Sequence, residues 1–266
     1  MATFPLYQVD AFADQVFRGN PAAVVPLESW LPEATLQAIA AENNLAETAF
    51  FVPQGDHYHL RWFTPAHEVP LCGHATLATA FVILTLLRPD LSLVEFSTLS
   101  GMLAVERGDG EFTLDFPRLD PEPVAAVPEA LLRGLGSAPR EVFQVTHDPN
   151  YYAVYDDESQ IRALQPDLAV LATLHPFGVV ITAPGRQADI VSRCFAPSYG
   201  IPEDPVTGSI HCALVPYWSA RLGRDQITAW QASPRGGRLR CRALRDRVFL
   251  TGTAVLYLQG TIGIPL

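Results

Sequence analysis

Short apolar runs, separated by turn-forming residues, follow one another along most of the chain. Runs in which apolar and polar residues alternate, or which are rich in Val, Ile, Phe and Tyr, are typical of β-strands. In the first half such runs predict strands at residues 6–12, 22–26, 48–52, 58–63, 93–96, 102–107 and 111–116. In the second half they predict strands at residues 142–146, 152–155, 177–182, 190–195, 227–231, 237–243, 247–251 and 254–259.

Helices are expected between several of these strands, because apolar residues there recur at helical spacing. The shorter helices are predicted at residues 32–43, near 161–164 and near 168–174. Two others, at residues 75–87 and 209–222, are strongly apolar, which is typical of buried helices. Pro216 lies within the second of them, where its missing N–H predicts a kink or an end. The mixture of strands and helices predicts an α/β fold of the α+β kind.

The two halves of the chain repeat one pattern. A strand that ends in Phe-X-Pro, at residues 63–65 and again at 195–197, is followed by a loop and by a glycine that opens a buried helix, Gly73 or Gly208. A helix N-terminus offers unpaired N–H groups and a positive dipole end, and glycine lets a ligand approach them closely. The two glycines are therefore candidate receptors for an anion such as a carboxylate. The alternative is that they only permit tight turns.

The repeat also predicts how the chain divides into domains. The proline-rich segment at residues 118–127 predicts a linker between the halves. We therefore expect two similar domains, residues 1–118 and 119–266, and leave open whether the final strand returns to the first domain. Two like domains are expected to face each other across a cleft, with both helix N-termini pointing into it.

Three titratable residues near these turns are candidates for acid/base chemistry. Glu47 stands between the end of a helix and an apolar strand, where a half-buried carboxyl is suited to proton transfer. His74 follows Gly73 at a helix N-terminus, where the dipole favours a neutral imidazole that relays a proton or binds substrate. Asp204 precedes Pro205 and either joins the site or caps its loop. A purely structural role is the alternative for each of the three.

Other candidate ligands and nucleophiles are less specific. Cys72 lies beside a helix N-terminus, which favours a lowered thiol pKa. Its counterpart in the second half is Thr207, so the chain cannot place one thiol on each face of a substrate carbon. We therefore expect both residues to line a binding site. His57, His59 and His67 have the composition of a metal cluster, but their segment is expected to be a surface hairpin, so no metal site is predicted.

Composition excludes several functions. All 18 basic residues are arginine, which rules out Schiff-base lysines and the lysine of a P-loop. A net charge of −10 disfavours nucleic acid as a partner, because phosphates would be repelled. The four cysteines lack CxxC spacing, no secretory signal is visible, and the longest apolar stretch is too short to span a bilayer. A cytoplasmic protein without a membrane partner is therefore expected.

A series of motifs runs through the chain in a fixed order. They are Val-Asp-Ala-Phe at 9–12, Gly-Asn-Pro-Ala at 19–22, Asn-Leu-Ala-Glu-Thr-Ala-Phe at 44–50, Arg-Trp-Phe-Thr-Pro at 61–65, Glu-Val-Pro-Leu-Cys-Gly-His-Ala-Thr at 68–76, Glu-Asp-Pro-Val-Thr-Gly-Ser at 203–209 and Arg-Gly-Gly at 235–237. In this order the chain resembles the phenazine-biosynthesis PhzF-like family from about residue 6 to 260. The resemblance implies a fold like diaminopimelate epimerase and proline racemase, with two similar domains that each curl a mixed sheet around a central buried helix.

The resemblance further implies a cofactor-free isomerase, usually a homodimer, that moves a proton on a small carboxylate substrate. Glu47 matches the family's acid/base glutamate, and the N–H groups of Gly73 and Gly208 would hold the substrate carboxylate. The family's other polar site positions correspond to His74, Asp204 and Ser209. Two rivals stay open: an amino acid epimerase or racemase, and a non-catalytic member that only binds a small molecule. The motifs specify neither the substrate nor the pathway.

Overall fold

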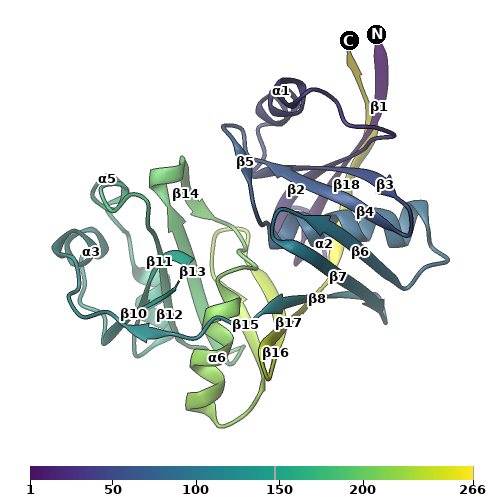
Figure 1. Cartoon of the computed structure of the whole chain (residues 1–266). Helices are drawn as coiled ribbons and strands as arrows, with labels where there is room; N and C mark the ends of the chain where they lie inside the picture. The colour runs from purple at the N-terminus through teal and green to yellow at the C-terminus, as the bar shows by residue number, and fades with distance from the viewer. Residues whose placement is uncertain (147, 266) are drawn as a thin grey trace. The chain divides into compact units, whose positions relative to one another are not determined.

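The computed structural model of the chain describes residues 1–146 and 148–265. The chain divides into two compact units: unit 1 comprises Met1–Phe116 and Leu250–Leu266, and unit 2 comprises Pro117–Phe249. Both units combine strands and helices, which confirms the predicted fold class (Figure 1). None of the helices in the described part of the chain is long and apolar enough to cross a membrane.

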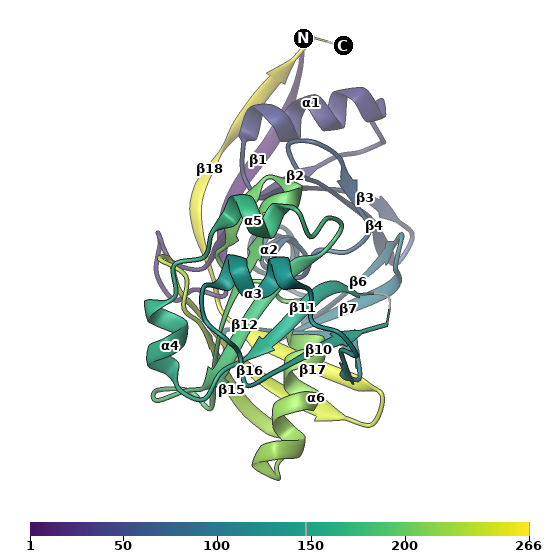
Figure 2. The ribbon, with the colours of Figure 1, turned by 90° about the vertical axis from the view of Figure 1, so that its left-hand side faces the viewer.

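Unit 1 contains one continuous mixed sheet. Its strands are β1 (Ala2–Ala11), β2 (Asn20–Pro26), β3 (Glu47–Gln54), β4 (His57–Phe63), β5 (Glu68–Val69), β6 (Leu93–Thr98), β7 (Gly101–Gly108), β8 (Glu111–Pro117) and β18 (Ala254–Ile264). β1 is antiparallel to β18 and β2, β2 is parallel to β3, and β3 is antiparallel to β4. β4 is antiparallel to β5 and parallel to β6, from which the sheet continues antiparallel through β7 to β8. The chain ends lie side by side, because Ala2 pairs with Ile264 (Figure 2).

The sheet of unit 1 surrounds a central helix, α2 (Gly73–Phe81), which widens into the π-helical turn η1 (Val82–Leu87). All the residues of α2 before Phe81 are buried, and the helix contacts β1, β2, β3 and β18. Its sequence is made of small and apolar residues, so strands approach it from several sides without leaving voids. A second helix, α1 (Glu33–Asn43), packs on β3 and β4 through the buried face that contains Leu36 and Ile39.

Unit 2 repeats the strand pairing of unit 1. Its strands are β9 (Glu122–Pro123), β10 (Glu141–Val145), β11 (Asp148–Val154), β12 (Gly178–Pro184), β13 (Ile190–Ala196), β14 (Ile201–Asp204), β15 (Gln226–Gln231) and β16 (Gly237–Leu244), and β17 (Arg247–Gly252) leads back to unit 1. β10 is antiparallel to β11, β11 is parallel to β12, and β12 is antiparallel to β13. β13 is antiparallel to β14 and parallel to β15, which is antiparallel to β16. The internal repeat seen in the sequence is therefore also a repeat of topology.

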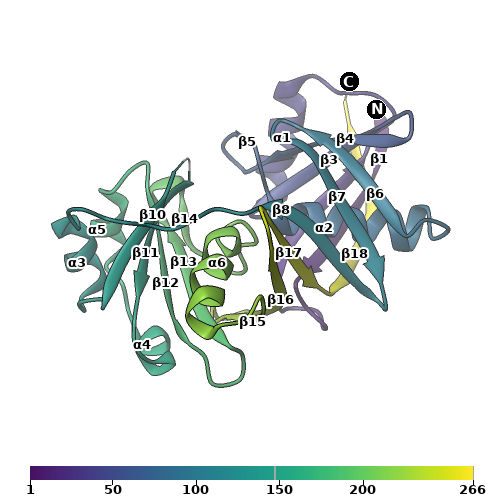
Figure 3. The same ribbon diagram turned by 60° about the horizontal axis from the view of Figure 1, so that its bottom comes forward.

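The central helix of unit 2 is α6 (His211–Leu222), which contacts β15 and β16 (Figure 3). It continues through Pro216, so the predicted stop at this residue is wrong. Proline cannot donate to the carbonyl of Cys212, but the N–H of Leu119 donates to that carbonyl at 3.0 Å and compensates the loss. The remaining helices of unit 2 are α3 (Glu129–Leu135), α4 (Glu158–Ala163), α5 (Leu168–Ala172) and the short 3₁₀ turn η2 (Pro197–Tyr199).

An arginine–glutamate ion pair occurs at the same place in each unit. Arg61 on β4 donates from Nε and Nη2 to the two carboxylate oxygens of Glu68 on β5, at 2.7 and 2.6 Å. Arg193 on β13 makes the same two bonds to Glu203 on β14, at 2.7 and 3.0 Å. Each pair bridges two neighbouring strands just before the loop that leads to the central helix. It therefore fixes where that loop begins.

Candidate active site

Glu47 is the first residue of β3, and its position follows from the way α1 ends. The helix stops at Asn43, and Asn44 adopts the left-handed conformation with φ 48°, which turns the chain back towards the sheet. β3 then pairs in parallel with β2, placing Glu47 opposite Ala22. The Glu47 side chain is 12% exposed, so the carboxyl group stands at the mouth of a buried strand.

His74 is the second residue of α2 and faces the carboxylate of Glu47. Cys72 precedes the helix in an extended conformation, with φ −146° and ψ 113°, and the helix begins at Gly73. Nε2 of His74 lies 3.0 Å from Oε2 of Glu47, and the imidazole is 4% exposed. Within the part of the chain that the structure describes, neither of these two buried atoms has a hydrogen-bond partner, so they meet as an ion pair. The Glu47–His74 pair is therefore the principal interaction of both groups.

The other ring nitrogen of His74, Nδ1, lies 3.1 Å from the side-chain amide of Asn20 and 3.5 Å from Sγ of Cys72. Burial lowers the pKa of His74, but the Cys72 sulfur and the Glu47 carboxylate outweigh burial and raise this pKa well above 6.5. The raised pKa favours the imidazolium form of His74 beside the Glu47 carboxylate at 3.0 Å, contrary to the neutral imidazole predicted from the helix dipole.

Cys72 is a buried thiol rather than a reactive thiolate. Burial raises the pKa of its thiol to about 11, and the negative charge of Glu47 acts in the same direction. The lowered thiol pKa predicted from the helix N-terminus is therefore wrong, because desolvation and the nearby carboxylate dominate. An un-ionised thiol is a poor nucleophile and a poor general base, so the geometry favours Cys72 as part of the site wall.

One cluster of possible metal ligands occurs within residues 1–146 and 148–265. Glu47, Cys72 and His74 form one group, each with a ligand atom within 4.8 Å of the others. The two ring nitrogens of His74 face different partners, Nδ1 towards the sulfur and Nε2 towards the carboxylate, which fits a proton pathway better than a single ion. His57 and His59 make hydrogen bonds to neighbouring side chains instead of assembling a cluster.

In unit 2 the structure brings Asp204 and Thr207 together. Asp204 closes β14 opposite Cys194 of β13, and its carboxylate accepts a hydrogen bond from the Thr207 hydroxyl at 2.5 Å. The side chain of Gln231, at the end of β15, binds the same loop through three hydrogen bonds. Gln231 was not found from the sequence, because it lies far from Asp204 along the chain and in no local motif.

Gly208 and Ser209 form a turn that leads into α6. The N–H of His211 donates to the carbonyl of Gly208 and the N–H of Cys212 donates to that of Ser209, both at 3.0 Å. These tight bonds delay the helix, which begins at His211 rather than at the predicted Ser209. The ring nitrogen Nδ1 of His211 lies 2.8 Å from the carbonyl oxygen of Thr207 and donates to it. Burial lowers the pKa of His211 to about 4, so this histidine is neutral, in contrast to His74.

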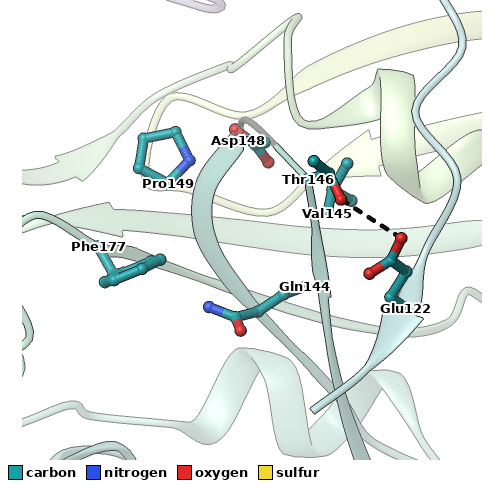
Figure 4. A pocket seen from close by; sticks show the side chains of 7 residues that line it. All are labelled: Glu122, Gln144, Val145, Thr146, Asp148, Pro149 and Phe177. Carbon is teal, nitrogen blue, oxygen red and sulfur yellow. Dashed lines mark hydrogen bonds between the residues drawn. The ribbon is translucent and has the colours of Figure 1, made fainter.

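Unit 2 also contains an open pocket of about 470 Å³ beside the start of β11 (Figure 4). Its lining residues are Glu122, Gln144, Val145, Thr146, Asp148, Pro149 and Phe177. Asp148 accepts hydrogen bonds from Tyr152 at 2.5 Å and from Asn150 at 2.9 Å, and burial raises its pKa. No residue that we predicted for the site lines this pocket.

The strand registers align the two units residue by residue. Glu47 begins β3, and the matching position at the start of β12 is Gly178. A Cβ atom at Gly178 would overlap the side-chain amide oxygen of Asn150, so that space is already filled. The residue in the place of His74 is Ser209. Unit 2 therefore has no counterpart of the Glu47–His74 pair.

Known proteins resemble this chain over nearly its whole length. The family model for phenazine biosynthesis-like proteins, PhzC-PhzF, matches residues 9–260. The uncharacterized isomerase PA2770 of Pseudomonas aeruginosa is 50% identical over 97% of this chain and 98% of its own length. The uncharacterized isomerase BH0283 of Halalkalibacterium halodurans is 42% identical, with coverage of 98% and 99%. The crystal structure of a PhzF-family protein of Enterococcus faecalis, 45% identical, superposes with a TM-score of 0.93 over 99% of this chain and 100% of that one.

A more distant structure shows the breadth of the fold. The probable proline racemase of Agrobacterium radiobacter is 12% identical, and superposes with a TM-score of 0.65 over 99% of this chain and 93% of that one. The epimerase-like fold predicted from the motifs is thus confirmed, and the enzyme class is isomerase. The chain belongs to the phenazine biosynthesis-like, PhzC-PhzF, family.

Proposed function

We propose that this isomerase moves a proton on a small carboxylate substrate, with Glu47 as the acid/base residue. The observation that carries the proposal is the buried Glu47–His74 pair, in which Nε2 and Oε2 are 3.0 Å apart. An imidazolium that donates to one carboxylate oxygen leaves the other oxygen of Glu47 to accept a proton from substrate. The same carboxyl group then returns this proton elsewhere on the substrate.

In the proposed reaction, Glu47 takes a proton from a substrate carbon and the C–H electron pair moves into an adjacent unsaturated system. The electrons next form a bond to the returning proton at a second carbon, so atoms and charge balance without another reactant. The positive charge of His74 stabilises the negative charge that develops between the two steps. We assign the substrate carboxylate to the N–H groups at the start of α2, where Gly73 has no side chain to block a close approach.

We assign the polar residues of unit 2 to the substrate as well. Asp204 accepts a hydrogen bond from an amino or hydroxyl group of the substrate and shares the proton, and Ser209 supplies a second polar contact. The N–H of Gly208 is assigned to a carboxylate group and Thr207 to the lining of the site in unit 2, whereas Cys72 lines the site in unit 1. The hydrogen bond of 2.5 Å from Thr207 to Asp204 supports a fixed carboxylate in this role. A homodimer in the cytoplasm, which the family resemblance implies, stays a prediction.

An amino acid epimerase is the second candidate, because the fold is shared with racemases. A two-base epimerase needs a base on each face of the reacting carbon. The position that matches Glu47 is Gly178, and the position that matches Cys72 is Thr207, whose hydroxyl already donates to Asp204. These observations favour the one-base isomerase. Binding of a small molecule without catalysis does not by itself explain the buried Glu47–His74 pair, so this pair favours an enzyme over a binding protein.

One experiment distinguishes the three candidate functions, which are a one-base isomerase, a two-base epimerase and a protein that only binds its ligand. Cyclic amino and hydroxy carboxylic acids are screened by thermal shift, and each binder is followed by ¹H NMR in D₂O. The isomerase predicts loss of the C–H signal of the reacting carbon together with a new isomer, and part of the substrate's original protium is retained at the new position in the product. A two-base epimerase inverts the centre with solvent hydrogen only. Binding without any exchange overturns the catalytic proposal.

A further inference from the structure

The side chain of Gln231 is completely buried and directs its hydrogen bonds to a single loop. Its Nε2 donates to the carbonyl oxygen of Asp204 at 2.8 Å and to the hydroxyl oxygen of Thr207 at 3.1 Å. Its Oε1 accepts from the backbone N–H of Thr207 at 2.8 Å. Both amide hydrogens and the amide oxygen are therefore committed to the segment between Asp204 and Thr207.

These bonds determine the direction of the Thr207 hydroxyl. A hydroxyl group has one hydrogen and accepts through its lone pairs. Because the Thr207 oxygen accepts from Gln231, its own hydrogen is free to point at Asp204, whose Oδ2 lies 2.5 Å away. Bonds in such a chain polarise one another in a low-dielectric interior. The order Gln231 to Thr207 to Asp204 thus holds the carboxylate in one orientation.

Two further residues of this loop, Glu203 and Pro205, are also held by hydrogen bonds. Glu203, the residue before Asp204, is held by the two bonds from Arg193. The hydroxyl of Ser233 donates to the carbonyl of Pro205 at 2.8 Å. Alternate residues of a strand point to opposite faces, so fixing Glu203 on one face sets the direction of Asp204 on the other.

The matching loop of unit 1 is built without such a glutamine. When the register of β4 with β6 is continued by one residue, Thr98 occupies the position of Gln231. The hydroxyl of Thr98 donates to the carbonyl of Gly101 at 2.8 Å and so serves its own hairpin. Unit 1 therefore forms its loop without such a clamp, by which we mean the three hydrogen bonds of the Gln231 side chain. The requirement for Gln231 is specific to the loop of unit 2 that carries Asp204.

We infer that Gln231 is a positioning residue for Asp204, acting through the Thr207 hydroxyl. The inference rests on the proposed function, because it assigns the oriented carboxylate to the substrate. A carboxylate only accepts hydrogen bonds, so this arrangement selects substrates that present an ammonium or hydroxyl group. Loss of the Gln231 side-chain amide removes these bonds and lets the side chains of Asp204 and Thr207 leave the orientation in which Asp204 accepts from substrate.

The test compares Gln231→Met, Gln231→Glu and the control Thr182→Val with wild type. Thr182 is equally buried in unit 2, and its hydroxyl makes two hydrogen bonds, to the carbonyl of Val191 and from the indole N–H of Trp218, neither of which we assign to the site. Gln231→Met is expected to lower kcat for the exchange reaction about ten- to hundred-fold, a larger loss than that of a control variant with a similar decrease in Tm. Thr182→Val is expected to lose similar thermal stability with kcat nearly unchanged.

Gln231→Glu supplies a second, pH-dependent readout. An ionised Glu at this position accepts the Thr207 hydrogen and draws it away from Asp204, whereas a protonated Glu donates as the amide does. Its kcat relative to wild type is therefore expected to rise as the pH falls, while the same ratio for Thr182→Val stays flat. Equal kcat losses in Gln231→Met and Thr182→Val at equal Tm, or a flat ratio for Gln231→Glu, would overturn the inference.

Crystal structures of wild type and Gln231→Met keep this test separate from the proposed function. The inference predicts that the Thr207 hydroxyl leaves hydrogen-bond distance of Asp204 in the variant, whatever the substrate is. An unchanged Thr207 and Asp204 overturns the positioning role. If wild type moves no proton on any carboxylate while the variant shows the displaced loop, the proposed function fails and the clamp stands.

Discussion

Nε2 of His74 lies 3.0 Å from Oε2 of Glu47, and both side chains are largely shielded from solvent. The pairing joins the second residue of the central helix of unit 1 to the first residue of a neighbouring strand. It places a positive and a negative charge at the start of a helix whose N–H groups favour anions. This couple has no counterpart in unit 2, although the two units share their strand topology.

The first prediction concerns the charge of His74. The Cys72 sulfur and the Glu47 carboxylate raise its pKa well above 6.5, so Glu47→Gln should lower this pKa, because a neutral amide no longer stabilises the imidazolium. ¹⁵N NMR titration of the ring nitrogens measures this directly. His211 is the internal control, since its pKa of about 4 has no carboxylate cause and should not respond to the substitution. A His74 pKa that is unaffected by Glu47→Gln contradicts the pairing.

The second prediction is a loss of stability in mild acid that originates at His211. The pKa of His211 is about 4 in the folded chain and near 6.5 when unfolded, so between these values the unfolded state binds more protons. The contribution of His211 to stability is therefore complete above pH 6.5, decreases as the pH falls towards 4, and changes no further below that pH. A shift of about 2.5 units corresponds to about 3 kcal/mol. Urea unfolding across this range should show the slope in wild type and not in His211→Gln.

The third prediction compares the two arginine–glutamate pairs. Arg193 also donates from Nη1 to two backbone carbonyls, at 3.2 and 2.7 Å, whereas the additional partner of Arg61 is an exposed carboxylate. Arg193→Met should therefore cost about 3 to 5 kcal/mol, because it strands Glu203 and both carbonyls. Arg61→Met should cost clearly less. Denaturant unfolding measures both, and equal costs would show that the carbonyl contacts contribute nothing.

In the same experiment, the double variant Arg193→Met with Glu203→Met is expected to be more stable than Arg193→Met alone. Removing the second partner also removes the partly buried carboxylate that is left unpaired in the single variant. A double variant that is no more stable than the single one would mean that Glu203 is well solvated without its arginine.

The fourth prediction tests the turn that brings Asn20 to His74. Gly19 has φ +63°, and a Cβ atom there would overlap the carbonyl oxygen of Ala11. Gly55 has a similar φ of +67° but open space around it, so Gly55→Ala isolates the backbone strain, about 1 kcal/mol. Gly19→Ala should lower the free energy of unfolding by at least about 2 kcal/mol more, because a backbone atom must move. It should also shift the His74 ring signals, which Gly55→Ala should leave in place.

The element pattern and the family were accessible from the sequence, and several features of the site were not. Hydrophobic periodicity located both central helices, and the motif around Glu47 led to the acid/base candidate. The charge of His74 was mispredicted, because it depends on a contact with a residue in another element. Pro216 likewise gave no sign that the N–H of Leu119 satisfies the freed carbonyl of Cys212.

Other features had a signal that could have been used. Arg61 and Arg193 each stand two residues before the phenylalanine of the repeated Phe-X-Pro motif. Glu68 and Glu203 each stand five residues before the glycine that follows the loop, Gly73 or Gly208. Aligning the halves on these positions would have predicted both ion pairs. Gln231 had no such signal, because its partners are reached only when β15 pairs with β13.

The most direct test of the central claim is proton exchange by Glu47→Gln. With a carboxylate that wild type isomerises in D₂O, ¹H NMR of the variant should show no exchange and no product, while calorimetry shows that the ligand still binds. Retained binding matters, because it separates loss of the proton carrier from loss of the fold. Exchange by Glu47→Gln at near the wild-type rate would contradict the account, and would place the proton carrier elsewhere in the chain.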